Sequence, residues 1–422
     1  MKEPFIWDHY SNQPHQLKDR VFKKRMRRHN LGSLIFTVLI SLMMLPVSLL
    51  LMPFLRRREI DTSHFFGMSV NLDSEPDLTP QLIEELGVKS LLIRLPLWEM
   101  DRLDEYVDFI KQFKTKKLLI NVMQDREHIE DAALFKEHIS LIFERLAPFS
   151  KTFQIGTTIN RAKWGFFSVN EYLNFYKIAY DVKKHHYPEL KLIGPSVIDF
   201  EYHFTAHALF NLSSIRFDAL SALLYVDRRG APENTQMGFD LIRKINFLAS
   251  MAVLSSKSSS ILYLTETNWP LTRTAPYAPT SEFECIDEKE YADFMVRYYL
   301  LSFATQKVDA VFWHQLIAPG YGLIDNRDGI RKRSAFLAFK TMLTHLKDTR
   351  FINFFVSDNF YTLTCENHYG HFDVLWSPHH TKMIEHNYVK IVAQDGSKLQ
   401  EREPISISSS VIYAYDNYKG NL

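Results

Sequence analysis

The sequence predicts an α/β fold whose main body is a (β/α)8 TIM barrel. Between residues 62 and 345, short apolar runs rich in Val, Ile, Leu and Phe alternate with longer amphipathic stretches. This alternation is typical of parallel strands joined by helices. Eight such runs occur, which is the number of strands that closes a TIM barrel. An uncharged apolar segment precedes this region, and short alternating runs follow it.

The predicted strands have similar lengths and leave room for a helix between most neighbours. In chain order they span residues 64–71, 90–95, 117–122, 152–156, 192–195, 219–225, 261–266 and 310–314. Helical periodicity is clearest in three of the connections, at 101–114, 169–186 and 289–305. After the barrel, residues 350–422 form short runs rich in Tyr, Phe, Val and Ile, with a turn at Asp395-Gly396. These runs predict a small antiparallel β domain.

The segment from Leu31 to Leu55 contains no charged residue. It exceeds the about 20 apolar residues that a helix needs to cross a bilayer. Basic residues are denser before the segment than after it, which places the N-terminus in the cytoplasm. We therefore expect a basic cytoplasmic tail at residues 1–30, a transmembrane helix at 31–55, and a barrel on the periplasmic or extracellular side of the inner or plasma membrane.

Two alternatives to this anchor fit less well. A cleaved signal peptide would have an unusually long charged region and lacks the small-residue cleavage pattern. A buried soluble helix would show a polar face, and none interrupts the run. The arginines at 56–58 favour the opposite orientation, in which the barrel faces the cytoplasm.

Composition excludes some classes of partner. A net charge of +1 gives no reason to expect nucleic acid. Cys285 and Cys365 lie far apart without metal-ligand spacing, and the 17 histidines are scattered along the chain. We therefore expect neither a metal nor an organic cofactor.

Reactive groups of a TIM barrel lie at the carboxyl ends of its strands. Glu266 follows the apolar run ILYLT and precedes Thr-Asn-Trp. A fixed carboxylate beside an aromatic residue suits the nucleophile of a glycosidase, whose transition state carries positive charge on the sugar. A solvated loop glutamate is the alternative. The other strand-end candidates are Asn71, Arg94, Gln124, Asp125, Thr157, Thr158, Asn160, Asp199, Glu201, Tyr225, Asp227, Trp313 and His314.

Four segments, in the right order, carry a resemblance to a known superfamily. They are LLIRLPLW (91–98), KLIGPSV (191–197), LYLTETNW (262–269) and AVFWHQLIAPGYGLID (310–325). Residues 62–345 resemble the clan A glycoside hydrolases, which are retaining TIM-barrel glycosidases. The following domain is similar to the β-sandwich that often accompanies such barrels. The resemblance implies that Glu266 is the nucleophile, that Arg94 lies near it, and that Trp313 belongs to the sugar-binding floor.

The fourth strand departs from the superfamily's pattern. There it normally ends in Gly-Asn-Glu-Pro, and the glutamate is the general acid/base. Here the stretch reads FQIGTTIN (153–160), so Thr157 and Thr158 replace Asn and Glu. A threonine cannot protonate a leaving group at neutral pH, and general acid–base catalysis contributes about 10²–10⁴-fold.

Two explanations of this departure remain open. The barrel could bind or position a glycan without hydrolysing it, or another carboxylate could supply the proton. The carboxylates that follow predicted strands are Asp125, Asp199, Glu201, Asp227 and Glu233. Unrelated chemistry on the same scaffold is a third possibility, since a fold does not fix a function.

The remaining candidates have a structural and a functional interpretation each. Tyr225 could hydrogen-bond the nucleophile or pack in the core, and His314 could bind sugar or be a buried histidine. Trp164 and Trp269 could be stacking platforms or core residues. The run 227–229 could be an internal ion pair or a site for an anionic sugar. The expected substrate-binding set is Asn71, Arg94, Asn160, Trp164, Tyr225, Trp269, Trp313 and His314.

The sequence thus predicts a membrane-anchored, glycoside-hydrolase-like protein that acts on a cell-envelope or secreted polysaccharide. Its expected partners are an oligosaccharide or polysaccharide and, through residues 31–55, a lipid bilayer. The alternative is a non-catalytic glycan-binding or scaffold protein in polysaccharide synthesis or export.

Overall fold

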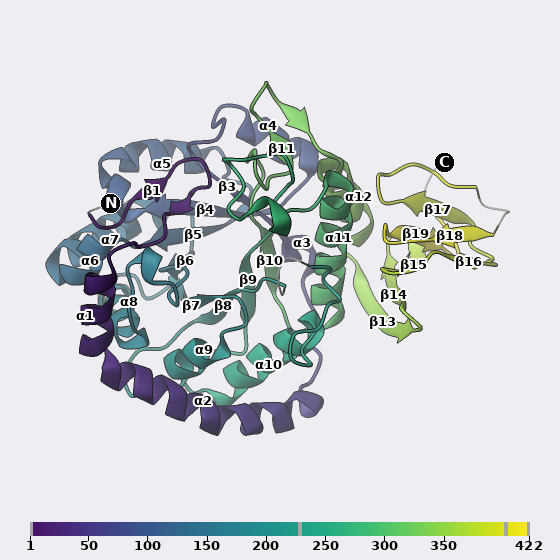
Figure 1. The fold of residues 1–422 in the computed structure, drawn as a ribbon. Helices are drawn as coiled ribbons and strands as arrows, with labels where there is room; N and C mark the ends of the chain where they lie inside the picture. Colours follow the sequence, from purple (N-terminus) through teal and green to yellow (C-terminus); the bar gives the residue numbers. More distant parts are fainter. Residues whose placement is uncertain (1–2, 227–229, 401–403, 420–422) are drawn as a thin grey trace.

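Eight parallel strands close into a barrel in the computed structural model, which describes residues 3–226, 230–400 and 404–419 (Figure 1). The order around the barrel is β10-β3-β4-β5-β6-β7-β8-β9, so the last strand pairs with the first. This confirms the predicted TIM barrel. The strands are β3 (Phe66–Val70), β4 (Ser90–Pro96), β5 (Lys117–Met123), β6 (Thr152–Ile155), β7 (Lys191–Ile198), β8 (Ala219–Leu223), β9 (Leu262–Thr267) and β10 (Ala310–Trp313).

Helices surround the strands, and several begin at a residue whose side chain caps the first turn. Ser168 accepts a hydrogen bond from the Glu171 backbone, and Asp287 accepts one from the Glu290 backbone. Such caps satisfy amides that have no partner within the helix. The principal helices of the barrel are α4 (Thr79–Leu86), α5 (Leu103–Lys111), α6 (Arg126–Glu130), α7 (Ala132–Leu146), α8 (Val169–His186), α9 (Tyr202–Leu209), α10 (Leu241–Leu254), α11 (Glu288–Ala304) and α12 (Ser334–Leu346).

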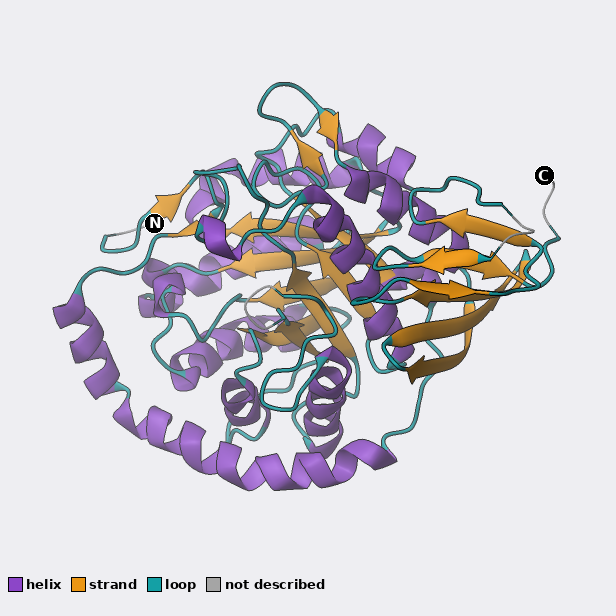
Figure 2. Cartoon of the chain, turned by 45° about the vertical axis from the view of Figure 1, so that its right-hand side comes forward, coloured by secondary structure: helices purple, strands orange, loops and turns teal. Residues whose placement is uncertain are grey.

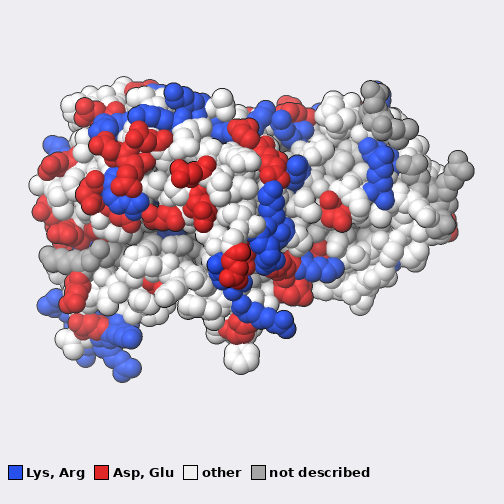
Figure 3. Space-filling model, turned by 90° about the horizontal axis from the view of Figure 1, so that it is seen from above, with Lys and Arg blue, Asp and Glu red and all other residues white. Residues whose placement is uncertain are grey.

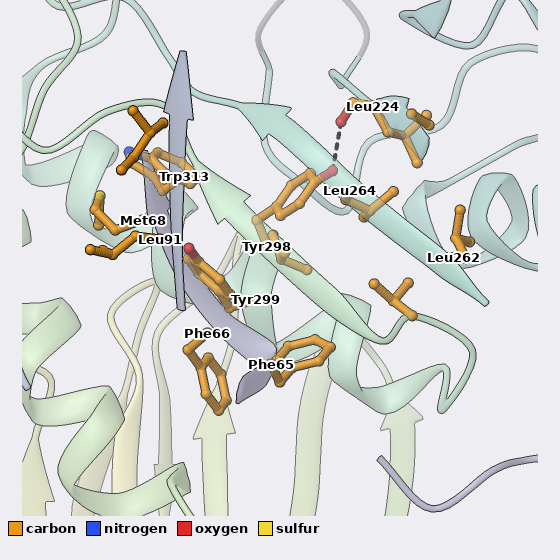
Figure 4. Packing of buried hydrophobic residues seen from close by; sticks show 14 of the residues in the cluster. Phe65, Phe66, Met68, Leu91, Leu224, Leu262, Leu264, Tyr298, Tyr299 and Trp313 are labelled. Carbon is orange, nitrogen blue, oxygen red and sulfur yellow. Dashed lines mark hydrogen bonds between the residues drawn. The ribbon is translucent and has the colours of Figure 1, made fainter. Parts of the chain in front are cut away.

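The core lies between the strands and these helices, and α11 contributes large aromatic side chains to it (Figure 4). Tyr298 and Tyr299 are fully buried. Their hydroxyls donate to the backbone oxygens of Leu224 and Gly67, each at 2.6 Å. Burying an unpaired hydroxyl is costly, so these two bonds fix α11 against the barrel.

The C-terminal region forms an antiparallel sheet beside α11 and α12 (Figure 1). This confirms the predicted small β domain. A hydrogen bond to a buried ion pair of the barrel joins the two. Arg297 Nε lies 3.0 Å from Glu233 Oε1, and Trp376 Nε1 of the β domain donates to the same oxygen at 3.0 Å. The sheet contains β13 (Arg350–Ser357), β14 (Phe360–Asn367), β15 (Gly370–Trp376), β19 (Ile412–Tyr415) and β17 (Lys390–Ala393), and a smaller pair contains β16 (Lys382–Ile384) and β18 (Ile405–Ile407).

Helix α2 (Leu31–Leu51), continued by the short turn η1 (Met52–Phe54), is long and apolar enough to span a membrane. It lies along the outside of the barrel, against α8, α9 and α10 (Figures 1 and 2). Thr37 on its inner side approaches His207 Nδ1 at 2.7 Å. Small polar side chains form much of that inner side, namely Ser33, Thr37, Ser41 and Ser48.

The outer side of α2 is apolar. Val38, Leu42 and Leu50 are 56%, 63% and 74% exposed. A helix on the surface of a soluble protein shows the opposite distribution, with apolar residues inward and polar residues outward. Exposed apolar surface of this extent is typical of a site that contacts lipid or another apolar surface.

The N-terminal residues contact the barrel, whereas the sequence predicted a separate tail. Strands β1 (Trp7–Asp8) and β2 (Gln13–Pro14) form a hairpin, and α1 (Arg20–His29) connects this hairpin to α2. After α2, Lys307 Nζ donates to the Leu55 carbonyl oxygen at 3.1 Å. The segments before and after α2 in the sequence both contact the same barrel. In this arrangement a bilayer cannot lie between the N-terminal hairpin and the barrel. The prediction rested on the basic residues of α1 and overlooked a small apolar cluster of Phe5, Leu17, Met26 and Phe167.

Charged side chains on the face drawn in Figure 3 lie mostly over the barrel, and the two signs are interspersed. Interspersed charges produce no extended field of one sign. That face therefore offers no broad electrostatic surface for a polyanion.

Candidate active site

Glu266 lies near the carboxyl end of β9, at the end of the barrel that we call the mouth. The hydroxyl of Tyr225, which follows β8, donates to Glu266 Oε1 at 2.8 Å. Strands β8 and β9 are parallel neighbours, so residues that follow one lie beside the end of the other. The hydrogen bond predicted between Tyr225 and the candidate nucleophile is therefore present. A hydrogen bond to an ionised group is among the stronger ones, and it fixes the carboxylate in one orientation.

A cavity of about 210 Å³ surrounds Glu266 at the mouth. The predicted residues that line it are Arg94, Thr158, Trp164, Tyr225 and His314. The lining residues that the sequence did not single out for the site are Ser11, Asn12, Gln13, Gln16, Arg161, Lys163, Ile198, Asn268, Pro279, Thr280 and Tyr321.

Four predicted substrate-binding residues lie outside the cavity lining. Trp269 and Trp313 are 1% and 0% exposed, and their rings stack on each other at 5.6 Å. Rings packed on both faces cannot stack on a sugar, so in this structure these tryptophans belong to the core. Asn160 Nδ2 donates to Glu201 Oε2 at 2.7 Å and links two strand-end loops. Asn71 Oδ1 accepts from the backbone of its own turn.

The loop after β6 carries Thr158, which lines the mouth. Thr158 is buried, and its φ is 51°, in the left-handed region that β-branched residues rarely adopt. Gln124 fixes this loop, because its Oε1 accepts from the Thr157 amide and its Nε2 donates to the Thr157 carbonyl, both at 2.9 Å. A strained residue held by its surroundings is a frequent sign of a functional site.

The other candidate carboxylates are held elsewhere. Arg161 pairs with both Asp199 Oδ2 at 2.5 Å and Glu201 Oε1 at 2.7 Å. Asp125 caps α6 and contacts His128 Nδ1 at 2.7 Å. Glu233 faces the β domain, as described above, and Asp227 lies outside the described residues. Glu266 is consequently the sole carboxylate among the described residues that line the mouth.

Lys163 is a residue of the mouth that the sequence did not single out. It lies in the short turn η3 (Ala162–Trp164), on the same loop as Thr158. Burial lowers the pKa of Lys163 to about 8, although the nearby Glu266 carboxylate opposes this effect. An ammonium group with such a pKa is protonated at neutral pH and can release its proton far more readily than an ordinary lysine.

His314 lines the mouth as a buried, neutral side chain. It is 6% exposed and stacks on the ring of Tyr321 at 5.4 Å. Burial lowers the pKa of His314 to about 4. Neutral imidazole carries one donor and one acceptor, so His314 can hydrogen-bond a sugar hydroxyl in either direction.

The N-terminal hairpin covers the mouth. Both terminal nitrogens of Arg94 donate to the Asn12 carbonyl oxygen at 3.2 Å, so this arginine contacts the hairpin. The Trp7 ring packs on Trp164 at 5.9 Å, and Lys163 Nζ donates to Gln13 Oε1 at 2.5 Å. With the hairpin in place, the cavity is smaller than the about 300–1,000 Å³ of typical ligand sites. A ligand larger than about one sugar unit therefore requires the hairpin to move.

The described residues contain no group of three or more His, Cys, Asp and Glu side chains that could hold a metal ion.

Comparison with known proteins shows similarity in structure and not in sequence. No protein-family model matches the chain, and no curated protein matches it. A family 39 glycoside hydrolase from the gut symbiont Bacteroides cellulosilyticus is similar with a TM-score of 0.63 and 14% identity, over 85% of this chain and 82% of that one. A GH30 endoxylanase from Clostridium papyrosolvens gives 0.58 and 10%, over 85% and 96%. A GH39 β-xylosidase from Caulobacter crescentus gives 0.57 and 12%, over 85% and 97%.

These solved structures are clan A glycoside hydrolases with a TIM barrel. The resemblance inferred from four short motifs is therefore confirmed at the level of the fold. At such low identity the similarity establishes the architecture, and the chemistry has to be argued from the residues of the mouth.

Proposed function

We propose that this protein is a membrane-associated glycoside hydrolase that acts on a cell-envelope or secreted glycan, with Glu266 as its nucleophile. The observation that carries the proposal is the 2.8 Å hydrogen bond from Tyr225 to Glu266 in a cavity at the mouth of the barrel. A carboxylate oriented at the strand ends can attack an anomeric carbon. Trp164 and Tyr321 supply aromatic surface, and His314 and Asn268 supply polar groups, as a sugar site requires.

Lys163 replaces the missing glutamate as the proton donor in this proposal. It lies on the loop after β6 and lines the same cavity as Glu266. As Glu266 attacks the anomeric carbon, the Lys163 ammonium would protonate the departing glycosidic oxygen. The resulting neutral amine would then take a proton from the water that cleaves the glycosyl–Glu266 ester. Both steps balance without a second carboxylate.

A non-catalytic role in glycan binding or scaffolding is the second candidate. The observation in its favour is that Glu266 has no partner carboxylate among the described residues of the mouth. A retaining glycosidase ordinarily places two carboxyl groups about 5–5.5 Å apart. The two candidates differ in whether the mouth turns substrate over.

Glu266→Gln separates these candidates. We expect the wild type to hydrolyse at least one of a panel of 2,4-dinitrophenyl glycosides, because this leaving group needs little protonation. Glu266→Gln should lose on the order of 10⁴-fold or more in kcat, since an amide cannot act as the nucleophile. Asp73→Asn, which changes a carboxylate outside the mouth, should keep wild-type turnover. Equal, background-level turnover by wild type and Glu266→Gln, with oligosaccharide binding retained, would establish the non-catalytic role.

Lys163→Met tests the proton donor. The variant should lose about 10²–10⁴-fold on phenyl glycosides, which need an acid, and little on dinitrophenyl glycosides. In the wild type, the rate on phenyl glycosides should fall as pH rises through about 8, because Lys163 then loses the proton that it donates. The variant should lack this alkaline decline. Lys151→Met, an exposed position on the other side of β6, serves as the control. An unchanged pH profile in Lys163→Met would rule this role out.

We further propose that α2 holds the protein at a membrane through its outer apolar side. The flanking charges predict that α2 crosses the bilayer, with the N-terminus in the cytoplasm and the barrel on the other side. That placement requires the hairpin to leave the mouth. The hairpin's contacts with Arg94 and Lys163 and the polar inner side of α2 favour the other placement, in which α2 lies along the membrane and both parts stay on one side.

Cysteine labelling distinguishes the two placements. Tyr10 in the hairpin and Leu212 on the barrel are 55% and 94% exposed. In a Cys285→Ser background, we expect Tyr10→Cys and Leu212→Cys to react with a membrane-impermeant maleimide from the same side of sealed membranes. Labelling from opposite sides would instead establish the spanning arrangement and contradict the hairpin's place in the mouth.

A further inference from the structure

A second cavity lies beside the mouth, between the candidate active site and α2. Its volume is about 430 Å³, within the range of about 300–1,000 Å³ that is common for small-molecule sites. Tyr225 lines both cavities, so the two adjoin at the residue that orients Glu266. The apolar residues that line the second cavity are Leu45, Phe200, Tyr202, Val226, Met237 and Phe239.

The chemistry of this second cavity differs from that of the mouth. Phe200 and Phe239 lie with their rings 5.0 Å apart, and Val226 is buried. Asp199 and Glu201 also line the cavity, but both pair with Arg161, which lines the mouth. The charged groups thus gather where the two cavities meet. The remaining wall is apolar apart from Gln236, whose Oε1 accepts a hydrogen bond from Lys244 Nζ, and it suits a hydrocarbon.

The second cavity also adjoins the apolar helix. Leu45 belongs to α2, whose outer side exposes Val38, Leu42 and Leu50. Apolar surface therefore extends from the outer side of α2, past Leu45, to the edge of the mouth at Tyr225. A molecule with a polar head and a hydrocarbon tail matches this sequence of surfaces, because its head can occupy the mouth while its tail stays out of water.

We propose that the second cavity binds the hydrocarbon chain of a membrane glycolipid whose sugar occupies the mouth. This inference rests on the proposed function and names the class of its substrate: a glycan attached to a lipid, in place of a free polysaccharide. The cavity accommodates the part of the chain nearest the sugar, and α2 holds the mouth at the membrane where such molecules lie. A free polysaccharide would leave an apolar cavity of this size unfilled.

The length dependence of binding tests this assignment. The probes are n-alkyl β-glucosides from butyl to octyl, measured by calorimetry on the full-length protein in amphipol. Each buried methylene should tighten binding about fourfold, which corresponds to about 0.8 kcal/mol. Met237 is 96% exposed at the edge of the cavity, so Met237→Asp places a charge at its entrance without disturbing the core. We expect this variant to flatten the dependence on chain length.

Leu212→Asp is the matched control, because Leu212 is equally exposed and does not line the second cavity. This variant should retain the wild-type dependence of binding on chain length. The comparison separates binding in the cavity from adhesion to α2 or to the amphipol. A diazirine at the chain end of the octyl probe should crosslink to the peptides that contain Phe200 or Phe239. Binding that is independent of chain length, an unchanged slope in Met237→Asp, or crosslinks elsewhere would overturn the proposal.

Glu266→Gln separates this inference from the proposed function. The variant keeps the second cavity intact, so it should keep the chain-length dependence while it loses turnover. A wild type that shows the slope but no turnover on any glycoside would remove the nucleophile role and leave the lipid site standing. Turnover by a wild type whose binding does not depend on chain length would keep the nucleophile role and remove the lipid site.

Discussion

The pairing of β10 with β3 closes eight parallel strands into a barrel, and every feature of the mouth depends on that closure. Residues from distant parts of the chain, such as Arg94 and Glu266, line one cavity because their strands end at the same rim. Tyr225 reaches Glu266 because β8 and β9 are neighbours in this ring. Closure also places Lys163 at the mouth, because its loop follows the carboxyl end of β6.

Local patterns in the sequence predicted the strands well but could not place every side chain. The barrel strands appear in the expected order because apolar runs and strand lengths are local properties. Trp269 and Trp313 were expected to contact sugar, yet both are buried and their rings stack on each other. Trp313 Nε1 also donates to Tyr291, and Trp269 Nε1 donates to the Gly230 carbonyl oxygen. Whether a strand-end aromatic faces the mouth depends on packing with distant helices, which no short motif records.

Two features of the site could not be predicted from the sequence. The hairpin contacts the mouth through residues far apart in the chain, as in the bond from Asn12 Nδ2 to Tyr321, 309 positions away. Such long-range contacts leave no periodic signal in the N-terminal residues, whose basic charges pointed to a tail. Lys163 was overlooked because its altered acidity arises from burial beneath the hairpin and not from its neighbours in sequence. The interpretation of Thr158 as a replaced acid/base stays a prediction from the sequence, and it directs attention to the loop that carries Lys163.

We propose that Glu266 attacks a sugar and forms a covalent bond with it. Incubation with a set of 2-deoxy-2-fluoroglycosyl fluorides, followed by peptide mass spectrometry, measures this directly, because such reagents trap the glycosyl intermediate of a retaining mechanism. We expect a glycosyl adduct on the peptide that contains Glu266 in the wild type, and no such adduct in Glu266→Gln. An adduct on a different carboxylate, or no adduct with any reagent that binds in the mouth, would contradict it.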